Sequence, residues 1–194
     1  MVWLVLGLVL FLGVHSLAIV APGVRERCVA QWGEMAWKGL YSLVSVLGFG
    51  LIVLGYAAAR EHPVALYHLP TAARHATALL MLPVFVLLLA AYLPGRIQRA
   101  AKHPMLLATK LWALSHLLAN GTLADVLLFG GFLAWAVADR ISVKRRSAAG
   151  PLRPVPVLPA SGWNDAVALI GGLALYVGFT LWAHAAWIGV RPFG

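Results

Sequence analysis

Two histidines and a lysine interrupt apolar stretches of the chain, and their types and positions suggest chemistry. His15 lies in segment 2–20, and Lys110 and His116 lie in segment 104–119. An ionisable group at membrane depth is costly, so each of the three is a candidate functional residue. A histidine can donate one ring nitrogen to iron while a carbonyl, hydroxyl or carboxylate holds the other. The two histidines predict metal ligation, with hydrogen bonding across a helix interface as the alternative.

The neighbours of His116 suggest which cofactor such a site would suit. Trp112 lies four residues before His116, on the same face of a helix, and would wall a flat cofactor or simply pack against a neighbouring helix. An apolar helical pocket with an axial histidine suits haem. Lys110 lies about 120° around the helix from His116 at 100° per residue, so it is not an obvious second ligand. We expect it to extend to the interface, or to pair with a cofactor carboxylate or an acidic side chain.

The remaining histidines and two of the aspartates have simpler explanations. Asp125, Asp139 and His184 lie near predicted segment ends, where interfacial water solvates them. Four further histidines lie in loops or at helix ends, where solvated surface positions are expected: His62, His68, His75 and His103.

Composition places the chain in a membrane. Hydrophobic residues make up 62% of its 194 residues and charged residues 11%, against roughly 25% charged in soluble domains. The net charge of +9 comes from Lys and Arg between apolar runs, not from a basic, aromatic-laced surface, so nucleic acid is not an expected partner. The single Cys28 excludes an intrachain disulfide.

The apolar segments predict an all-α, polytopic bundle of about six transmembrane helices forming one domain, 1–194. None of them alternates like a transmembrane strand. The segments are 2–20, 40–59, 75–93, 104–119, 122–139 and 165–189. Pro104 suits the first turn of the fourth segment, and the basic, proline-rich stretch 141–160 is expected to leave the helix and run partly as polyproline II.

Loop charges predict the orientation of the bundle. The loops after the first, third and fifth segments carry three, three and five Lys and Arg residues, whereas the opposite side carries two, none and one. The positive-inside rule therefore places both termini outside the cytoplasm. The basic loops would attract anionic membrane lipid.

The stretch "KHPMLLATKLWALSHLLANG" at 102–121 resembles the signature of the NnrU family of bacterial membrane proteins, associated with nitrogen-oxide metabolism. The likeness extends from "GVHSLA" at 13–18 to Asp139 and Arg140. The family is also similar to the plant and cyanobacterial 15-cis-ζ-carotene isomerase. The resemblance implies an integral protein of the bacterial inner (cytoplasmic) membrane.

In that isomerase two histidines are implicated as ligands of haem b within a helical bundle. By resemblance the first corresponds to His15 and the second to His116, which ends the "W-x-x-x-H" stretch that begins at Trp112. The isomerase has a cysteine three residues before its second histidine, thought to exchange as an iron ligand, and this chain has Ala113 there. The resemblance thus implies haem b on His15 and His116, with Trp112 and Lys110 in the predicted cofactor site, and no ligand exchange at Ala113.

Three classes of function follow as hypotheses. The first is a haem-binding membrane protein of nitrogen-oxide metabolism, or a redox-gated isomerase of a lipophilic small molecule. The second is an S-adenosylmethionine-dependent membrane methyltransferase. Lys102–Pro104 resembles the "RHP"-like motif of these enzymes only in part, and the acidic pair that follows it in them is missing here. The third is a non-enzymatic assembly factor for a membrane enzyme complex.

Overall fold

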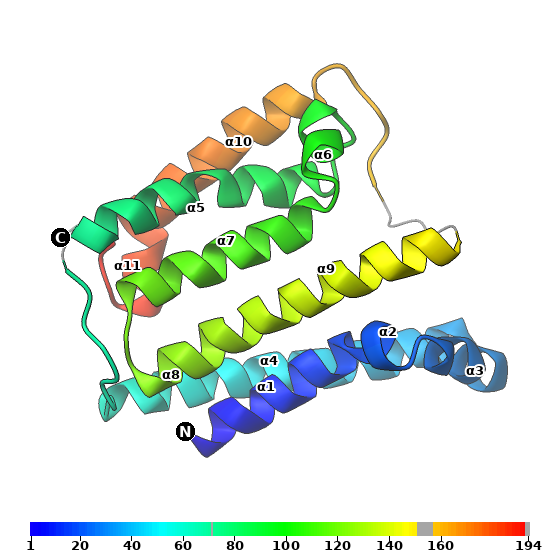
Figure 1. Cartoon of the computed structure of the whole chain (residues 1–194), viewed down its shortest axis with the longest axis horizontal. Helices are drawn as coiled ribbons and strands as arrows, with labels where there is room; N and C mark the ends of the chain where they lie inside the picture. Colours follow the sequence, from blue (N-terminus) through cyan, green and yellow to red (C-terminus); the bar gives the residue numbers. More distant parts are fainter. Residues whose placement is uncertain (71, 151–156, 193–194) are drawn as a thin grey trace. The chain divides into compact units, whose positions relative to one another are not determined.

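The computed structural model describes residues 1–70, 72–150 and 157–192. Over these residues the chain folds into helices (Figure 1), and an isolated antiparallel bridge pairs Ala65 with Thr122. The helices are α1 (Val2–His15), α2 (Leu17–Val20), α3 (Gly23–Trp32), α4 (Glu34–Glu61), α5 (Ala72–Ala90), α6 (Arg96–Ala101), α7 (Pro104–Ala119), α8 (Leu123–Asp125), the π-helical turn η1 (Val126–Gly130), α9 (Gly131–Ala149), α10 (Asn164–Gly178), the π-helical turn η2 (Phe179–Ala183) and α11 (His184–Ile188). The predicted all-α class is confirmed.

The chain divides into two compact units, and each is described by itself. The first comprises Met1–His68 and Gly121–Ala148, and the second comprises Leu69–Asn120 and Ala149–Gly194. The single domain expected over 1–194 stays a prediction.

Within the described residues, four helices are long and apolar enough to cross a bilayer, fewer than the six predicted. The stretches long and apolar enough to cross a bilayer are Glu34–Glu61, Ala72–Ala90, Leu123–Ala149 and Asn164–Ile188. With 14 and 16 residues, α1 and α7 measure about 21 and 24 Å, short of the roughly 30 Å of hydrocarbon. The predicted segment 2–20 is divided at Ser16 into α1 and the short α2, and the Ser16 hydroxyl donates to the Leu12 carbonyl at 2.6 Å.

In the first unit α1 lies antiparallel along the apolar middle of α4, through glycines. Gly55 lies against Leu4, and Gly48 lies against both Gly7 and Phe11. A Cβ atom on Gly48 would lie 2.8 Å from the Phe11 backbone nitrogen, and one on Gly7 would lie 2.8 Å from the Gly48 carbonyl oxygen. Small residues of this kind let helix backbones approach closely in membranes. The short α1 is therefore held against the apolar surface of a helix that is long enough to span.

The basic segment after residue 139 is helical, which corrects the expected loop. α9 continues to Ala149 because "ISVKRRSAA" holds neither Gly nor Pro and is rich in good helix formers, whose positive charges are favourable near a helix C-terminus. The polyproline II conformation expected further on falls largely on residues 151–156, which lie outside the described residues. The basic stretch containing Cys28 is also helical, as α3.

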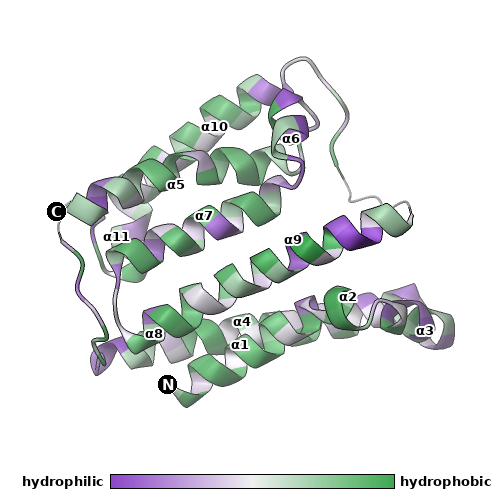
Figure 2. Cartoon of the chain, in the orientation of Figure 1, coloured by the Kyte–Doolittle hydropathy of each residue, from purple (hydrophilic) through white to green (hydrophobic). Residues whose placement is uncertain are grey.

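Hydrophilic residues mark the ends of the first unit. Figure 2 shows them in α3 and in the C-terminal half of α9, whereas α1 is mainly hydrophobic. Large apolar side chains are exposed along α4, among them Leu43, Val46, Phe49 and Leu54. Such exposed apolar helices indicate association with membrane lipid.

In the second unit α7 and α10 both pack against α5. Val84 and Leu87 of α5 form a buried cluster with Ala108 of α7, and the Tyr176 hydroxyl of α10 donates to the Ala78 carbonyl at 3.1 Å. The α7 boundaries 104–119 are as predicted, with Pro104 at the start, where its missing N–H costs nothing.

The start of α10 fastens the start of α6 in the same unit. The Asp165 carboxylate accepts hydrogen bonds from the backbone N–H groups of Arg96 at 2.8 Å and Ile97 at 2.9 Å. These are among the first N–H groups of α6, which lack partners within their own helix. The Asn164 amide donates to the Pro94 carbonyl at 2.9 Å, so two neighbouring polar residues hold the turn that leads into α6.

Candidate functional site

His15 ends α1 inside a group of aromatic rings from the first unit. Its imidazole stacks on Phe11, with ring centroids 4.2 Å apart, and lies 5.3 Å from Tyr41 of α4 and 6.1 Å from Trp135 of α9. Its Nδ1 lies 2.6 Å from the Phe11 carbonyl oxygen. The half-buried imidazole is therefore oriented both by ring contacts and by a hydrogen bond within its own helix.

His116 is held by the same local arrangement in the second unit. Its Nδ1 lies 2.8 Å from the carbonyl oxygen of Trp112, four residues earlier on α7. The Trp112 and His116 ring centroids are 5.5 Å apart, and Trp112 also packs against the Val84, Leu87 and Ala108 cluster. Trp112 thus links the helix core to the histidine, as its spacing predicted.

The two hydrogen bonds fix which imidazole nitrogen has the lone pair. A carbonyl only accepts, so Nδ1 carries the proton in both rings. In the neutral imidazole Nε2 is then the nitrogen that can donate a lone pair to a metal. This is the arrangement typical of metal-ligating histidines, whose other ring N–H is held by a carbonyl or carboxylate.

The four residues of the predicted cofactor site are divided between the two units. His15 belongs to the first unit, whereas Lys110, Trp112 and His116 belong to the second. Lys110 is half-buried on α7. Their grouping around one cofactor stays a prediction, because each unit is described by itself.

The structure brings no three His, Cys, Asp or Glu side chains of the described residues into a group that would hold a metal ion. A haem site with two histidine ligands needs no such group, because histidine is a usual axial ligand of haem iron. Ala113 is fully buried, and its methyl group offers no ligand atom. The donor set of the chain therefore fits haem with imidazole ligands and excludes a thiolate at this position.

Sequence reasoning missed the residues that surround His15 from other helices. Tyr41 and Trp135 lie 26 and 120 positions along the chain from His15, so no spacing rule on α1 points to them. The Nε1 atom of Trp135 is buried and has no hydrogen-bond partner within the described residues. The sequence marked Trp135 only as the single tryptophan of the predicted apolar segment 122–139.

Asp125 is more buried than its expected position near a segment end suggested, with 4% of its surface exposed. Its carboxylate accepts from the Tyr56 hydroxyl at 2.5 Å and from the Thr122 hydroxyl and N–H at 2.6 and 2.9 Å. Together with its own N–H bond to Thr122, these contacts form a capping box at the start of α8. Burial, followed by the charge of Asp125, raises the pKa of the nearby Tyr67 hydroxyl. The network explains the buried carboxylate as a helix cap.

Comparison with known families identifies the chain. The family model described as NnrU protein matches residues 3–192 and so runs through both units. Comparisons with curated proteins and with solved structures give no match. With this match and four helices of transmembrane length among the described residues, the chain is an integral membrane protein that belongs to the NnrU family.

Proposed function

We propose that this chain binds haem b through His15 and His116 and acts in nitrogen-oxide metabolism. The observation that carries the proposal is the shared arrangement of the two imidazoles, in which a carbonyl four residues earlier holds Nδ1 and leaves the lone pair on Nε2. Aromatic rings at both histidines add apolar surface of the kind that buries a porphyrin. Bound haem would supply one-electron redox chemistry, or a Lewis acid for a small nitrogen oxide.

The residues of the chain have distinct parts in this proposal. His15 and His116 bind the iron, and the Phe11 and Trp112 carbonyls hold the imidazoles in the ligating tautomer. Trp112 walls the site, and Lys110 pairs with a carboxylate of the cofactor. The buried Ala113 is incompatible with a thiolate ligand switch, so nitrogen-oxide chemistry is favoured over redox-gated isomerisation of a lipophilic substrate.

Haem content tests the proposal directly. After expression with ample haem supply and purification in mild detergent, we expect a Soret band and about one haem b per pair of ligand histidines, hence per chain. The pyridine haemochrome assay measures the type and amount of haem. Protein that is folded but free of haem under these conditions would remove the proposal.

We also propose that the chain lies in the inner membrane with both termini outside the cytoplasm. This orientation requires the short helices α1 and α7 to cross the membrane as well, beside the longer helices and in a locally thinned bilayer. Within the first unit, the basic helix α3 and the basic end of α9 lie at the same end (Figure 2). This arrangement supports the loop-charge prediction, in which both stretches lie on the cytoplasmic side.

The single cysteine offers a probe of this orientation. Cys28 lies on α3 and is free. A membrane-impermeant maleimide added to intact spheroplasts should leave Cys28 unlabelled, and labelling should appear once the membrane is permeabilised. A Cys28→Ala, Val190→Cys variant, with its cysteine near the opposite terminus, should give the reverse pattern. Labelling of Cys28 in intact spheroplasts contradicts the orientation.

A further inference from the structure

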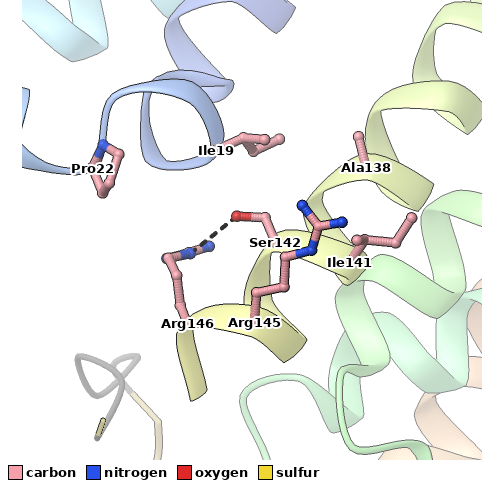
Figure 3. Close-up of a pocket in the computed structure, with 7 residues that line it drawn as sticks. All are labelled: Ile19, Pro22, Ala138, Ile141, Ser142, Arg145 and Arg146. Atoms are coloured by element: carbon pink, nitrogen blue, oxygen red, sulfur yellow. Dashed lines mark hydrogen bonds between the residues drawn. The ribbon is translucent and has the colours of Figure 1, made fainter. Parts of the chain in front are cut away.

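A cavity of about 380 Å³ opens at the basic end of the first unit. One wall is a face of α9 that carries Ala138, Ile141, Ser142, Arg145 and Arg146. The first four of these residues are spaced at i, i+3, i+4 and i+7, so they share one side of the helix. Ile19 and Pro22 form the opposite wall (Figure 3). The cavity thus joins an apolar half to a basic half.

The two arginines of the cavity differ in their partners. The Arg146 guanidinium contacts Asp139 at 3.3 Å and donates through Nε to the Ser142 hydroxyl at 3.2 Å. Asp139 therefore offsets its charge and holds it in place. Arg145 is exposed, and within the described residues it forms no ion pair or hydrogen bond. The cavity consequently carries a net positive charge and a guanidinium whose donors are available.

The position of the cavity along the helix places it at the level of lipid headgroups. The apolar stretch Leu123–Ala149 has 27 residues, which is about 40 Å at 1.5 Å per residue, against roughly 30 Å of hydrocarbon. Its last turns, which carry the basic residues, therefore extend beyond the acyl chains. Ala138 and Ile141 lie one to two turns closer to the hydrocarbon than Arg145.

We propose that this cavity is a binding site for an anionic phospholipid. The headgroup phosphate binds Arg145, with Arg146 and Ser142 beside it, and the first part of an acyl chain lies along Ile19, Ala138 and Ile141. Arginine suits the phosphate because its planar fork presents several donors to the oxygen atoms. An anionic lipid matches the net charge better than a zwitterionic one, and the apolar wall favours a lipid over a soluble anion. The cavity size is within the range usual for small-ligand sites.

Native mass spectrometry of the full chain in detergent tests the site. The probes are phosphatidylglycerol, phosphatidylcholine with matched acyl chains, and inorganic phosphate. We expect phosphatidylglycerol to remain bound to wild-type protein, phosphatidylcholine to bind at least about tenfold more weakly, and inorganic phosphate not to compete at lipid-like concentrations. Equal binding of the two lipids, or displacement of lipid by equimolar phosphate, would overturn the proposal.

Two adjacent residues provide a matched pair of variants. Arg145→Gln and Lys144→Gln remove the same charge from the same exposed stretch of α9, but only Arg145 lines the cavity. Arg145→Gln should weaken phosphatidylglycerol binding about tenfold, through loss of charge-assisted hydrogen bonds. Lys144→Gln should weaken it about twofold or less at physiological salt, because distant exposed charges are screened. Equal losses would indicate diffuse attraction and contradict a built site.

A change on the apolar wall tests the acyl part of the proposal separately. Ala138→Trp fills the cavity without changing charge, and Ala138 is exposed, so the helix tolerates the larger side chain. We expect at least about a fivefold loss of phosphatidylglycerol binding with an unchanged thermal unfolding curve, because the indole occupies the volume of the lipid. Undiminished lipid binding in this variant would overturn the proposal.

Discussion

Replacing His116 with alanine is expected to lower the haem b content of the purified protein at least about tenfold, and His15→Ala is expected to do the same. Loss of an iron ligand should cost no less than loss of an outer-shell partner, which already weakens metal sites about 10- to 100-fold. The measurement is the haem-to-protein ratio, from the haemochrome assay and the protein absorbance. Thermal unfolding of each variant separates loss of haem from loss of fold.

His184 provides the matched control for both histidine variants. Its Nδ1 also lies close to a carbonyl, that of Val190 at 2.7 Å, but this contact is exposed. His184→Ala therefore removes the same side chain and the same kind of hydrogen bond without touching the proposed ligands. Its haem content should equal that of the wild type. A similar loss of haem in all three variants would show that the effect is not ligation.

The second large effect is expected from the close contact between α1 and α4 in the first unit. Gly48→Leu introduces a Cβ atom 2.8 Å from the Phe11 backbone nitrogen, so α1 must move away from α4. We expect the free energy of unfolding to fall by about 3 kcal/mol, at the upper end of typical overpacking costs, because backbone relieves a clash less readily than a side chain. Unfolding by sodium dodecyl sulfate in mixed micelles measures the change.

Gly50→Leu is the control for this substitution. It lies two residues further along α4, and a Cβ atom there would meet nothing within 4 Å. The same increase in side-chain size and the same gain in helix propensity are therefore present without the clash. Gly50→Leu should be neutral or slightly stabilising. Equal stability of the two variants would contradict the close packing of α1 against α4.

The close packing also connects stability to the proposed site. Phe11 meets Gly48 through its backbone and stacks on His15 through its ring. Its carbonyl holds the His15 Nδ1 atom. Displacement of α1 in Gly48→Leu is therefore expected to disturb His15 as well, and the haem content of this variant should fall with its stability.

Periodicity and composition predicted where the helices lie in the sequence more accurately than they predicted the lengths of the helices. The apolar runs identify the helices, because burying a backbone in lipid requires internal hydrogen bonding. Fewer helices than predicted reach spanning length within the described residues, because α1 and α7 have only 14 and 16 residues. The end of α9 was placed too early because Lys144–Arg146 were interpreted as a loop, although lysine and arginine are good helix formers.

The candidate site was predictable only where the information is local. The free-energy cost of placing an ionisable side chain at membrane depth pointed to His15 and His116, and helix spacing placed Trp112 beside His116. Tyr41 and Trp135, which lie beside His15, and Tyr56, which binds Asp125, come from other helices. Contacts between helices depend on packing and on the rotation of each helix, which spacing within a single segment does not encode.

The most direct test of the central claim is the low-temperature electron paramagnetic resonance spectrum of the ferric protein, purified after expression with ample haem. Two imidazoles on one iron predict a low-spin signal that is lost, or becomes high-spin, when either His15 or His116 is replaced by alanine, and that persists in His184→Ala. A low-spin signal unchanged in both the His15 and His116 variants, or a wild-type protein with no haem signal at all, would contradict the account.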